Sequence, residues 1–261
     1  MDPIAIYAAP KNTIKFIYMN TDQTIEQLQT LRLGGMALRY SAIADLPVHQ
    51  LQNVHELVAG IVQAEIEHRD HAKTQKYLKA SRLRYFAVPE EIMCTSERGI
   101  TKEQILRLSD GQFIRRGENV LITGATGCGK SYLACALGRS ACLLGYKTLY
   151  FSMNRFMDTL IQVKLDGTYL KWIKSIATNK LLILDDFGLK PMDADTRLTL
   201  LDLLEDRYAQ SSVLITSQLP VESWYDYINE PTLADAIMDR MTASAHRLEL
   251  KGKSLRKKKN H

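Results

Sequence analysis

The stretch Gly124-Ala-Thr-Gly-Cys-Gly-Lys130-Ser131 fits the pattern G-x-x-x-x-G-K-[ST] of a phosphate-binding loop. An apolar run at 119–123 precedes it and is typical of a buried strand, and a helical pattern begins at Ser131. A strand, a loop and a helix in this order are the context that the motif requires. They favour a phosphate site over a chance glycine-rich turn.

The loop residues predict a site for a nucleoside triphosphate. Gly124, Gly127 and Gly129 allow backbone conformations that a Cβ would forbid, so successive N–H groups can surround an anion. The following helix adds the positive end of its dipole. Lys130 is expected to reach the β- and γ-phosphates, and the Ser131 hydroxyl is expected to ligate Mg²⁺. The predicted nucleotide-binding residues are Gly124, Ala125, Thr126, Gly127, Cys128, Gly129, Lys130 and Ser131.

A second motif, Leu181-Leu-Ile-Leu184-Asp185-Asp186, is an apolar run that ends in two carboxylates. Such a run is typical of a central parallel strand, and ligands bind at the carboxyl edge of a parallel sheet. Asp185 is therefore predicted to hold Mg²⁺ or its water shell. Asp186 is predicted to orient or deprotonate an attacking water. The alternative, two solvated acids in a turn, leaves the apolar residues before them unexplained.

Composition narrows the class of protein. The 261 residues suffice for one large domain with a small module, and 46% of them are hydrophobic. The sequence shows neither an apolar run of bilayer length nor a secretory signal, so no membrane partner is expected. Its four cysteines have no C-x-x-C spacing, and Cys128 lies inside the phosphate-binding loop. Reduced cysteines in a cytoplasmic protein are the simplest interpretation.

The positive charge is concentrated at the C-terminus. Net charge is +5, and the last eleven residues hold six lysines and arginines and no acid. Such a tail could lie on nucleic-acid phosphates or could simply be a solvated terminus, and both interpretations stay open.

Sequence patterns divide the chain into four parts. Residues 1–20 are expected to be a flexible extension, 21–87 an all-helical domain, 88–252 a nucleotide-binding domain and 253–261 a basic tail. Thr101 and Gln104 form a capping-box pattern that opens a helix in the third part. Helical patterns alternate with strand candidates there, which predicts an α/β fold with a doubly wound parallel sheet. The strand candidates are 119–123, 147–152, 181–185, 212–216 and 245–250.

The chain resembles the AAA+ ATPases of the DnaA/DnaC clade, and within it the IstB-like ATPases, which are helper proteins of two-gene insertion sequences. The resemblance runs from about Thr24 to Lys257 and implies an AAA+ fold with a five-stranded parallel sheet, ATP and Mg²⁺ as cofactors, and ATPase activity. Besides the phosphate-binding loop, the segments that carry it are 24–36, 116–120, 181–188, 215–220, 231–240 and 248–252.

The resemblance also implies roles for residues outside the two motifs. Gln218 follows the fourth strand candidate, beside the phosphate-loop strand, and would hold the attacking water and sense the γ-phosphate; the alternative is a polar residue that caps a strand. Arg240, in Asp239-Arg240-Met241, matches an arginine finger that acts on the nucleotide of a neighbouring subunit, which implies a head-to-tail homo-oligomer. The alternative is an ion pair with Asp235 or Asp239. Arg256 matches a second phosphate-sensing arginine.

A helical stretch at 154–178 follows the second strand candidate and carries Lys164, Lys171 and Lys174 together with Tyr169 and Trp172. In the clade that the chain resembles, a helix inserted here contacts DNA. The resemblance therefore implies binding of double-stranded DNA without sequence preference, through contacts to phosphate and sugar. The alternative is that Tyr169 and Trp172 pack in the core.

The function expected from these observations is that of an ATP-dependent DNA-binding ATPase that assembles on duplex DNA and assists a cognate transposase. A loader of a replicative helicase, similar to DnaC, is an alternative with the same ATPase machinery. A small-molecule kinase is a second alternative. It is less favoured, because the sequence shows no arginine-bearing lid and Arg240 would have no purpose.

Overall fold

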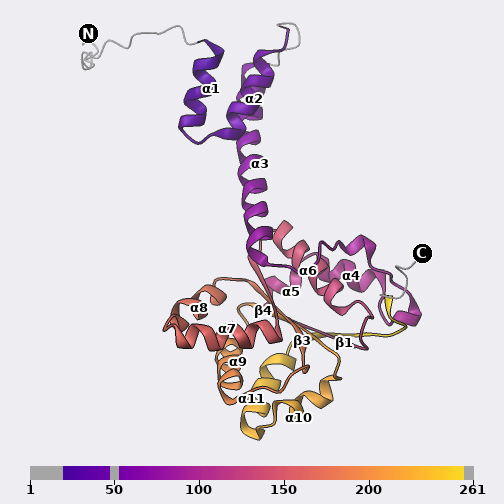
Figure 1. Ribbon diagram of the computed structural model, residues 1–261. Helices are drawn as coiled ribbons and strands as arrows, with labels where there is room; N and C mark the ends of the chain where they lie inside the picture. Colours follow the sequence, from indigo (N-terminus) through magenta and orange to yellow (C-terminus); the bar gives the residue numbers. More distant parts are fainter. Residues whose placement is uncertain (1–19, 48–52, 256–261) are drawn as a thin grey trace, which may run out of the picture. The chain divides into compact units, whose positions relative to one another are not determined.

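The computed structural model describes residues 20–47 and 53–255 (Figure 1). The chain divides between His71 and Ala72 into two compact units, whereas the predicted domain boundary follows residue 87. The extension expected over 1–20 lies outside the described residues except for Asn20, and so do Arg256 and the rest of the basic tail from 256 to 261.

The N-terminal unit is helical, as predicted. It contains α1 (Thr21–Thr30), α2 (Gly34–Ala44) and the first part of α3 (Val54–Ser81). Asn20 caps α1 by accepting a hydrogen bond from the backbone N–H of Gln23 at 2.8 Å. Helices α2 and α3 approach closely, because a Cβ on Gly35 would lie only 2.4 Å from the carbonyl oxygen of Ala64. Glycine at this position permits that approach.

A carboxylate on α3 caps the N-terminus of α2. Oε2 of Glu65 accepts hydrogen bonds from the backbone N–H groups of Gly35 at 2.8 Å and Met36 at 3.1 Å, and Oε1 accepts one from Nε of Arg69 at 2.6 Å. The N-cap residue of α2, Leu33, has an apolar side chain and cannot supply this cap. The hydrogen bond from Arg69 lowers the pKa of the buried Glu65 carboxyl, with the two backbone N–H groups acting in the same direction against the effect of burial.

We expect the Glu65→Gln variant to lose hydrogen-exchange protection at the amides of Gly35 and Met36 several-fold at neutral pH. A carboxyl whose pKa is lowered in the folded state stabilises that state fully above its unfolded pKa, near 4.5, and loses this contribution as pH falls through the lower folded value. The difference between wild type and variant should therefore shrink below about pH 4.5. Glu67→Gln, on the exposed side of α3, is the control and should match wild type. Equal protection in Glu65→Gln at pH 7 would contradict the capping role.

The second unit contains a five-stranded parallel sheet with strand order β2-β3-β4-β1-β5, which confirms the predicted fold class. Strand β4 pairs with β1. This is the neighbour relation that the resemblance implied for the strand that precedes Gln218. The strands closely match the predicted ranges. They are β1 (Asn119–Gly124), β2 (Thr148–Ser152), β3 (Leu181–Phe187), β4 (Ser212–Ser217) and β5 (Ala245–Leu250).

Helices cover both faces of this sheet (Figure 1). Val120 and Ile122 of β1 pack into one apolar cluster and Leu121 into the other, because successive side chains of a strand point to opposite faces. The first cluster lies under α4 (Lys102–Ser109), α5 (Gln112–Arg115) and α6 (Lys130–Leu143). The second lies under α7 (Met153–Leu165), α8 (Tyr169–Ala177), α9 (Ala194–Arg207), α10 (Trp224–Ile228) and α11 (Pro231–Thr242). Short 3₁₀ turns occupy Pro89–Glu91, Ser96–Arg98 and Val221–Ser223.

The capping box predicted for a helix in the third part of the chain is confirmed. The capping box at the start of α4 is present, with the N–H of Gln104 donating to Oγ1 of Thr101 at 3.2 Å and the N–H of Thr101 donating to Oε1 of Gln104 at 2.9 Å. Cys128, Cys135 and Cys142 are free and buried. In the described part of the chain, none of the helices has the length and apolar character needed to span a bilayer.

Candidate nucleotide-binding site

The phosphate-binding loop joins the end of β1 to the start of α6 and depends on glycine. Gly124, Gly127 and Gly129 have φ angles of 142°, 80° and 100°, which L side chains rarely adopt. A Cβ on Gly127 would in addition lie 2.2 Å from Oγ of Ser254, so the loop has no room for a side chain there. The sequence motif and the backbone geometry therefore agree.

Lys130, the first residue of α6, places its ammonium group inside the curve of the loop. Its Nζ donates to the carbonyl oxygens of Gly124 at 2.8 Å and Ala125 at 3.0 Å, and the side chain is buried. The loop thus holds a positive charge beside the N-terminus of α6, where an anion is already favoured by the helix dipole.

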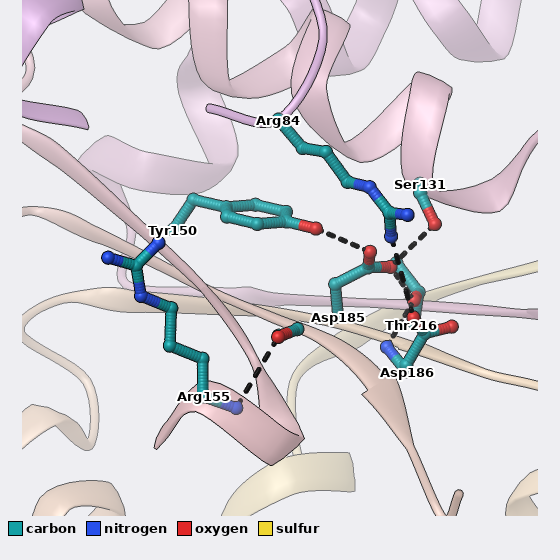
Figure 2. Close-up of polar contacts among 8 residues, drawn as sticks. Arg84, Ser131, Tyr150, Arg155, Asp185, Asp186 and Thr216 are labelled. Carbon is teal, nitrogen blue, oxygen red and sulfur yellow. Dashed lines mark hydrogen bonds and ion pairs between the residues drawn. The ribbon is translucent and has the colours of Figure 1, made fainter. Parts of the chain in front are cut away.

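Three hydroxyl groups hold the carboxylate of Asp185 at the end of β3 (Figure 2). Ser131 donates to Oδ1 at 2.9 Å, Thr216 donates to the same oxygen, and Tyr150 donates to Oδ2 at 2.6 Å. Burial, together with the hydrogen bond to Asp185, raises the pKa of Tyr150, so its phenol keeps its proton and stays a donor. Tyr150 and Thr216 come from the two strands that flank β3.

The oxygens of Ser131 and Asp185 form a donor set that fits Mg²⁺. They lie 2.9 Å apart at the mouth of the phosphate-binding loop. Mg²⁺ prefers oxygen ligands and is usually bound by one or two carboxylates together with the phosphates of its nucleotide. Asp185 is fully buried, so its position is determined by its partners and by the sheet around it.

Asp186 faces the same site because the end of β3 is irregular. The pairing register between β3 and β4 shifts between Leu184 and Phe187, and Asp186 has a φ angle of 62° in the left-handed region. Its backbone N–H donates to Oγ1 of Thr216 at 3.1 Å. Its carboxylate Oδ2 lies 3.8 Å from NH1 of Arg84, whose guanidinium group points at the two aspartates (Figure 2). The irregularity lets two consecutive carboxylates serve one site.

A cavity of about 300 Å³ at the loop brings the predicted groups together. Oε1 of Gln218, from the segment after β4, accepts a hydrogen bond from Oγ1 of Thr126 at 2.6 Å. The cavity therefore collects residues from five separate segments of the sequence. The lining residues are Tyr85, Thr126, Gly127, Gly129, Lys130, Ser131, Tyr132, Asp186, Gln218 and Leu255.

A second cavity, of about 280 Å³, adjoins the first and has mainly apolar walls. Tyr132 and Leu255 line both cavities, and the N–H of Leu255 donates to the carbonyl oxygen of Gly127 at 2.9 Å. Apolar walls beside a phosphate loop suit a flat nucleotide base. Besides those two residues, the walls include Ile92, Met93, Ile100, Cys128, Leu133 and Leu250, with Arg98 donating to the carbonyl oxygen of Cys128.

Sequence reasoning missed several residues of this site, namely Arg84, Tyr85, Tyr150, Arg98 and Leu255. Tyr150 lies inside a predicted strand. The alternation of side chains along that strand could have placed the Tyr150 side chain on the face of the sheet that α6 covers. The others come from irregular segments before α4 and after β5, where the sequence has no periodic signal. They join the site only through the tertiary fold.

Arg240 lies at the other end of β1 from the phosphate-binding loop. Its backbone carbonyl accepts a hydrogen bond from Nδ2 of Asn119 at 2.9 Å, and the strand from Asn119 to Gly124 spans roughly 17 Å at about 3.3 Å per residue. Its NH2 lies 2.8 Å from Oε1 of Glu205, and its NH1 lies 3.9 Å from Oδ2 of Asp239. An ion pair with Asp239 was expected as one alternative, whereas Glu205 is an additional partner.

The three lysines predicted to contact DNA differ in their surroundings. Nζ of Lys164 lies 3.0 Å from Oδ2 of Asp195 and 5.6 Å from the centre of the Tyr169 ring. Lys171 and Lys174 are exposed on α8. Trp172 packs against the core, with its ring centre 5.4 Å from that of Phe156, so the core interpretation of Trp172 is correct.

The sequence profile of the IstB-like ATP binding protein family matches residues 26–261. The chain belongs to this family. The match confirms the resemblance inferred from the loop, the β3 motif and the Arg240 segment, and it spans both compact units of the structure.

Similar proteins of known sequence include two that cover most of this IstB-like chain. An insertion sequence ATP-binding protein of Sinorhizobium fredii, y4pL, is 39% identical over 234 residues, which are 90% of this chain and 96% of that protein. The ATP-binding protein of insertion sequence IS1162 of Pseudomonas fluorescens is 35% identical over 203 residues, which are 77% of this chain and 88% of that protein.

Solved structures show the same fold at low sequence identity. The replication initiator DnaA bound to AMPPCP and single-stranded DNA has a TM-score of 0.56 and 18% identity, over 66% of this chain and 52% of that chain. The DnaC helicase loader has a TM-score of 0.51 and 19% identity, over 67% of this chain and 99% of that chain. The family match makes this chain an ATP-binding protein and an ATPase, and the solved structures show that it has the AAA+ fold.

Proposed function

We propose that this IstB-like ATPase assembles head to tail on duplex DNA when it binds ATP, and that the assembly assists a cognate transposase in DNA transposition. The transposition setting is supported by the names of its relatives, which are ATP-binding proteins of insertion sequences. The observation that carries the assembly is the position of Arg240. Its side chain is 28% exposed, and the residue lies at the opposite end of β1 from the phosphate-binding loop of the same chain.

Each residue of the site has a role in ATP hydrolysis under this proposal. Lys130 binds the β- and γ-phosphates, and Ser131 and Asp185 hold Mg²⁺, which supplies neutralisation of phosphate charge. Asp186 accepts a proton from the attacking water, and Gln218 orients that water beside the γ-phosphate. Arg240 of the adjacent copy stabilises the charge that develops on the transferred phosphoryl group.

The DNA contact is proposed at α8. Lys171 and Lys174 are three residues apart on one helix, so both lie near the same face and can contact one phosphate backbone. Lys164 contributes less, because Asp195 already neutralises part of its charge. Contacts of lysine to phosphate carry no information about the bases, which supports DNA binding without sequence preference. The free cysteines support a cytoplasmic location, because thiols stay reduced there.

Duplex DNA is expected to stimulate ATP hydrolysis by the wild-type protein, and the Lys171→Ala/Lys174→Ala variant is expected to lose most of this stimulation. Each lost phosphate contact should reduce the slope of log affinity against log salt by about 0.9, so the double variant should lose roughly two units. DNA affinity would be measured by fluorescence anisotropy with a non-hydrolysable ATP analogue present. Lys102→Ala/Arg107→Ala, two exposed cations on α4, is the matched control.

Two results would contradict the proposal. If the protein remains a monomer by light scattering when saturated with the ATP analogue and duplex DNA, head-to-tail assembly is wrong. If the α8 and α4 variants lose DNA affinity equally, the assignment of the contact to α8 is wrong. The likeness to DnaC shows the fold alone and does not decide between the two partners. ATPase activity that responds to a replicative helicase and does not respond to a transposase would favour the loader alternative.

A further inference from the structure

A cavity of about 150 Å³ lies where β1 begins, at the opposite end of this strand from the phosphate-binding loop. Its walls include the side chains of Arg116, Arg207 and Arg240 and a single carboxylate, that of Glu118. We call it the arginine cavity. The start of β1 contributes Asn119, so the cavity is separated from the nucleotide site by the length of that strand.

Arg207, the last residue of α9, carries a buried charge that the described residues do not neutralise. Its side chain is 2% exposed. NH2 donates to the carbonyl oxygen of Ser212 at 2.8 Å, whereas Nε and NH1 are buried and find no hydrogen-bond partner among residues 20–47 and 53–255. Burial lowers the pKa of Arg207 to about 10, so the group is still charged at neutral pH.

The nearby carboxylates are already engaged elsewhere. Oε2 of Glu118 lies 2.7 Å from Nε2 of His246, and its Oε1 lies 3.7 Å from NH1 of Arg116. Glu205 pairs with Arg240 at 2.8 Å. A buried charge without a partner is strongly unfavourable, and protein interiors therefore pair such groups or supply a ligand. An anion bound in the arginine cavity would therefore neutralise part of its excess positive charge.

We propose that the arginine cavity binds a small oxyanion of the phosphoryl class, with inorganic phosphate as its simplest member, next to the buried charge of Arg207. Phosphate oxygens are strong acceptors, and an anion beside a guanidinium group offsets the cost of its buried positive charge. A cavity volume of about 10–15 Å³ is enough for one water molecule, so a cavity of about 150 Å³ has room for a tetrahedral anion. At about half the volume of the cavity beside the loop, it is too small for a whole nucleotide. The inference does not depend on assembly or on DNA binding.

The test separates this cavity from the phosphate-binding loop, which also binds phosphate. The full-length protein is saturated with Mg²⁺ and a non-hydrolysable ATP analogue, and its thermal unfolding is followed as phosphate replaces chloride at constant ionic strength. Wild type should gain roughly 5–10 °C when phosphate reaches 100 times its dissociation constant. Arg207→Met should lose this gain, and Arg115→Met, a surface change outside the cavity, should keep it.

The variant also discriminates ligand binding from a purely structural role. Replacing an unpaired buried charge by an apolar side chain of similar length removes the cost of burying that charge, and this cost exceeds the contribution of the one hydrogen bond to Ser212. Arg207→Met should therefore unfold at or above the wild-type temperature when phosphate is absent, and a clear decrease would count against the proposal. Should that variant fail to fold, Arg116→Ala at the exposed rim decides the matter, because it should weaken the phosphate response without touching the core.

Two sources of the phosphoryl group are distinguished by a pyrophosphate arm. A gain in unfolding temperature with phosphate and none with pyrophosphate assigns the cavity to free phosphate. A gain in unfolding temperature with both anions assigns the cavity to phosphoryl groups in general, including the terminal phosphoryl group of a larger molecule. No gain beyond the chloride control with either anion would overturn the inference.

Discussion

The Arg240→Ala variant should still bind ATP but should hydrolyse it roughly 10³–10⁵-fold more slowly, the range for loss of an arginine finger. The reason is positional. Arg240 lies at the far end of β1 from its own phosphate-binding loop, and in the proposed head-to-tail assembly it acts on the nucleotide of an adjacent copy. Turnover would be measured by phosphate release at saturating DNA, and ATP binding by a fluorescent analogue.

Mixing two inactive variants tests the action between copies directly. Arg240→Ala retains Asp186, and Asp186→Asn retains Arg240, so an interface formed by one of each recovers a complete site. We expect the mixture to regain activity that neither variant has alone. Failure of the mixture to recover, while both variants still assemble, would contradict the finger assignment.

A second control separates the finger from the ion pair seen in the structure. Glu205→Gln removes the 2.8 Å partner of Arg240 and leaves the guanidinium in place. If the ion pair alone mattered, Glu205→Gln and Arg240→Ala would reduce turnover alike. We expect Glu205→Gln to keep most of the wild-type activity, since a partly exposed pair contributes little to stability.

Replacing Asp185 by asparagine should lower Mg²⁺-dependent ATP hydrolysis by roughly 10³-fold or more, because a bound metal supplies several kcal/mol of charge stabilisation. The amide side chain would have the same shape as the carboxylate but no charge, and only one oxygen to accept from the hydroxyls of Ser131, Thr216 and Tyr150. The hydroxyls can rotate to accept as well as donate, so the fold should survive.

The deciding measurement for this variant is the Mg²⁺ dependence of ATP affinity. In wild type, affinity should rise as Mg²⁺ is added, and chelation of the metal should abolish hydrolysis. In Asp185→Asn, affinity should be nearly independent of Mg²⁺ and equal to that of wild type without metal. Asp202→Asn, an exposed carboxylate on α9, serves as the control. An unchanged Mg²⁺ response in Asp185→Asn would remove Asp185 from the metal site.

Local features of this site were predictable because they depend on residues close in sequence. The loop from Gly124 to Ser131 needs glycines at positions with positive φ, and that requirement is visible in the motif. The apolar run before Asp185 indicated a central strand, and that strand is present and buried. Thr101 and Gln104, three positions apart, predicted a capping box, which is formed.

Partners across the fold were predictable only where a strand order could be anticipated. Placing β4 beside β1 brought Gln218 to the loop, and its contact with Thr126 follows from that neighbour relation. The hydroxyls of Tyr150 and Thr216 that hold Asp185 were not predicted, because their contribution requires knowing which face of β2 and β4 each side chain occupies. A register shift in β3, which no pattern in the sequence announces, turns Asp186 toward the same cavity.

The amino-acid sequence by itself determined the phosphate-binding loop, the parallel strands and the family, since glycine conformation, strand periodicity and motif spacing are local properties. Only the tertiary structure decided that Leu255 and Tyr132 close an apolar cavity, that Glu205 pairs with Arg240, and that Arg207 is buried without a neutralising partner among the described residues. Burial and charge balance depend on every element that packs around a group, and those elements come from distant parts of the chain.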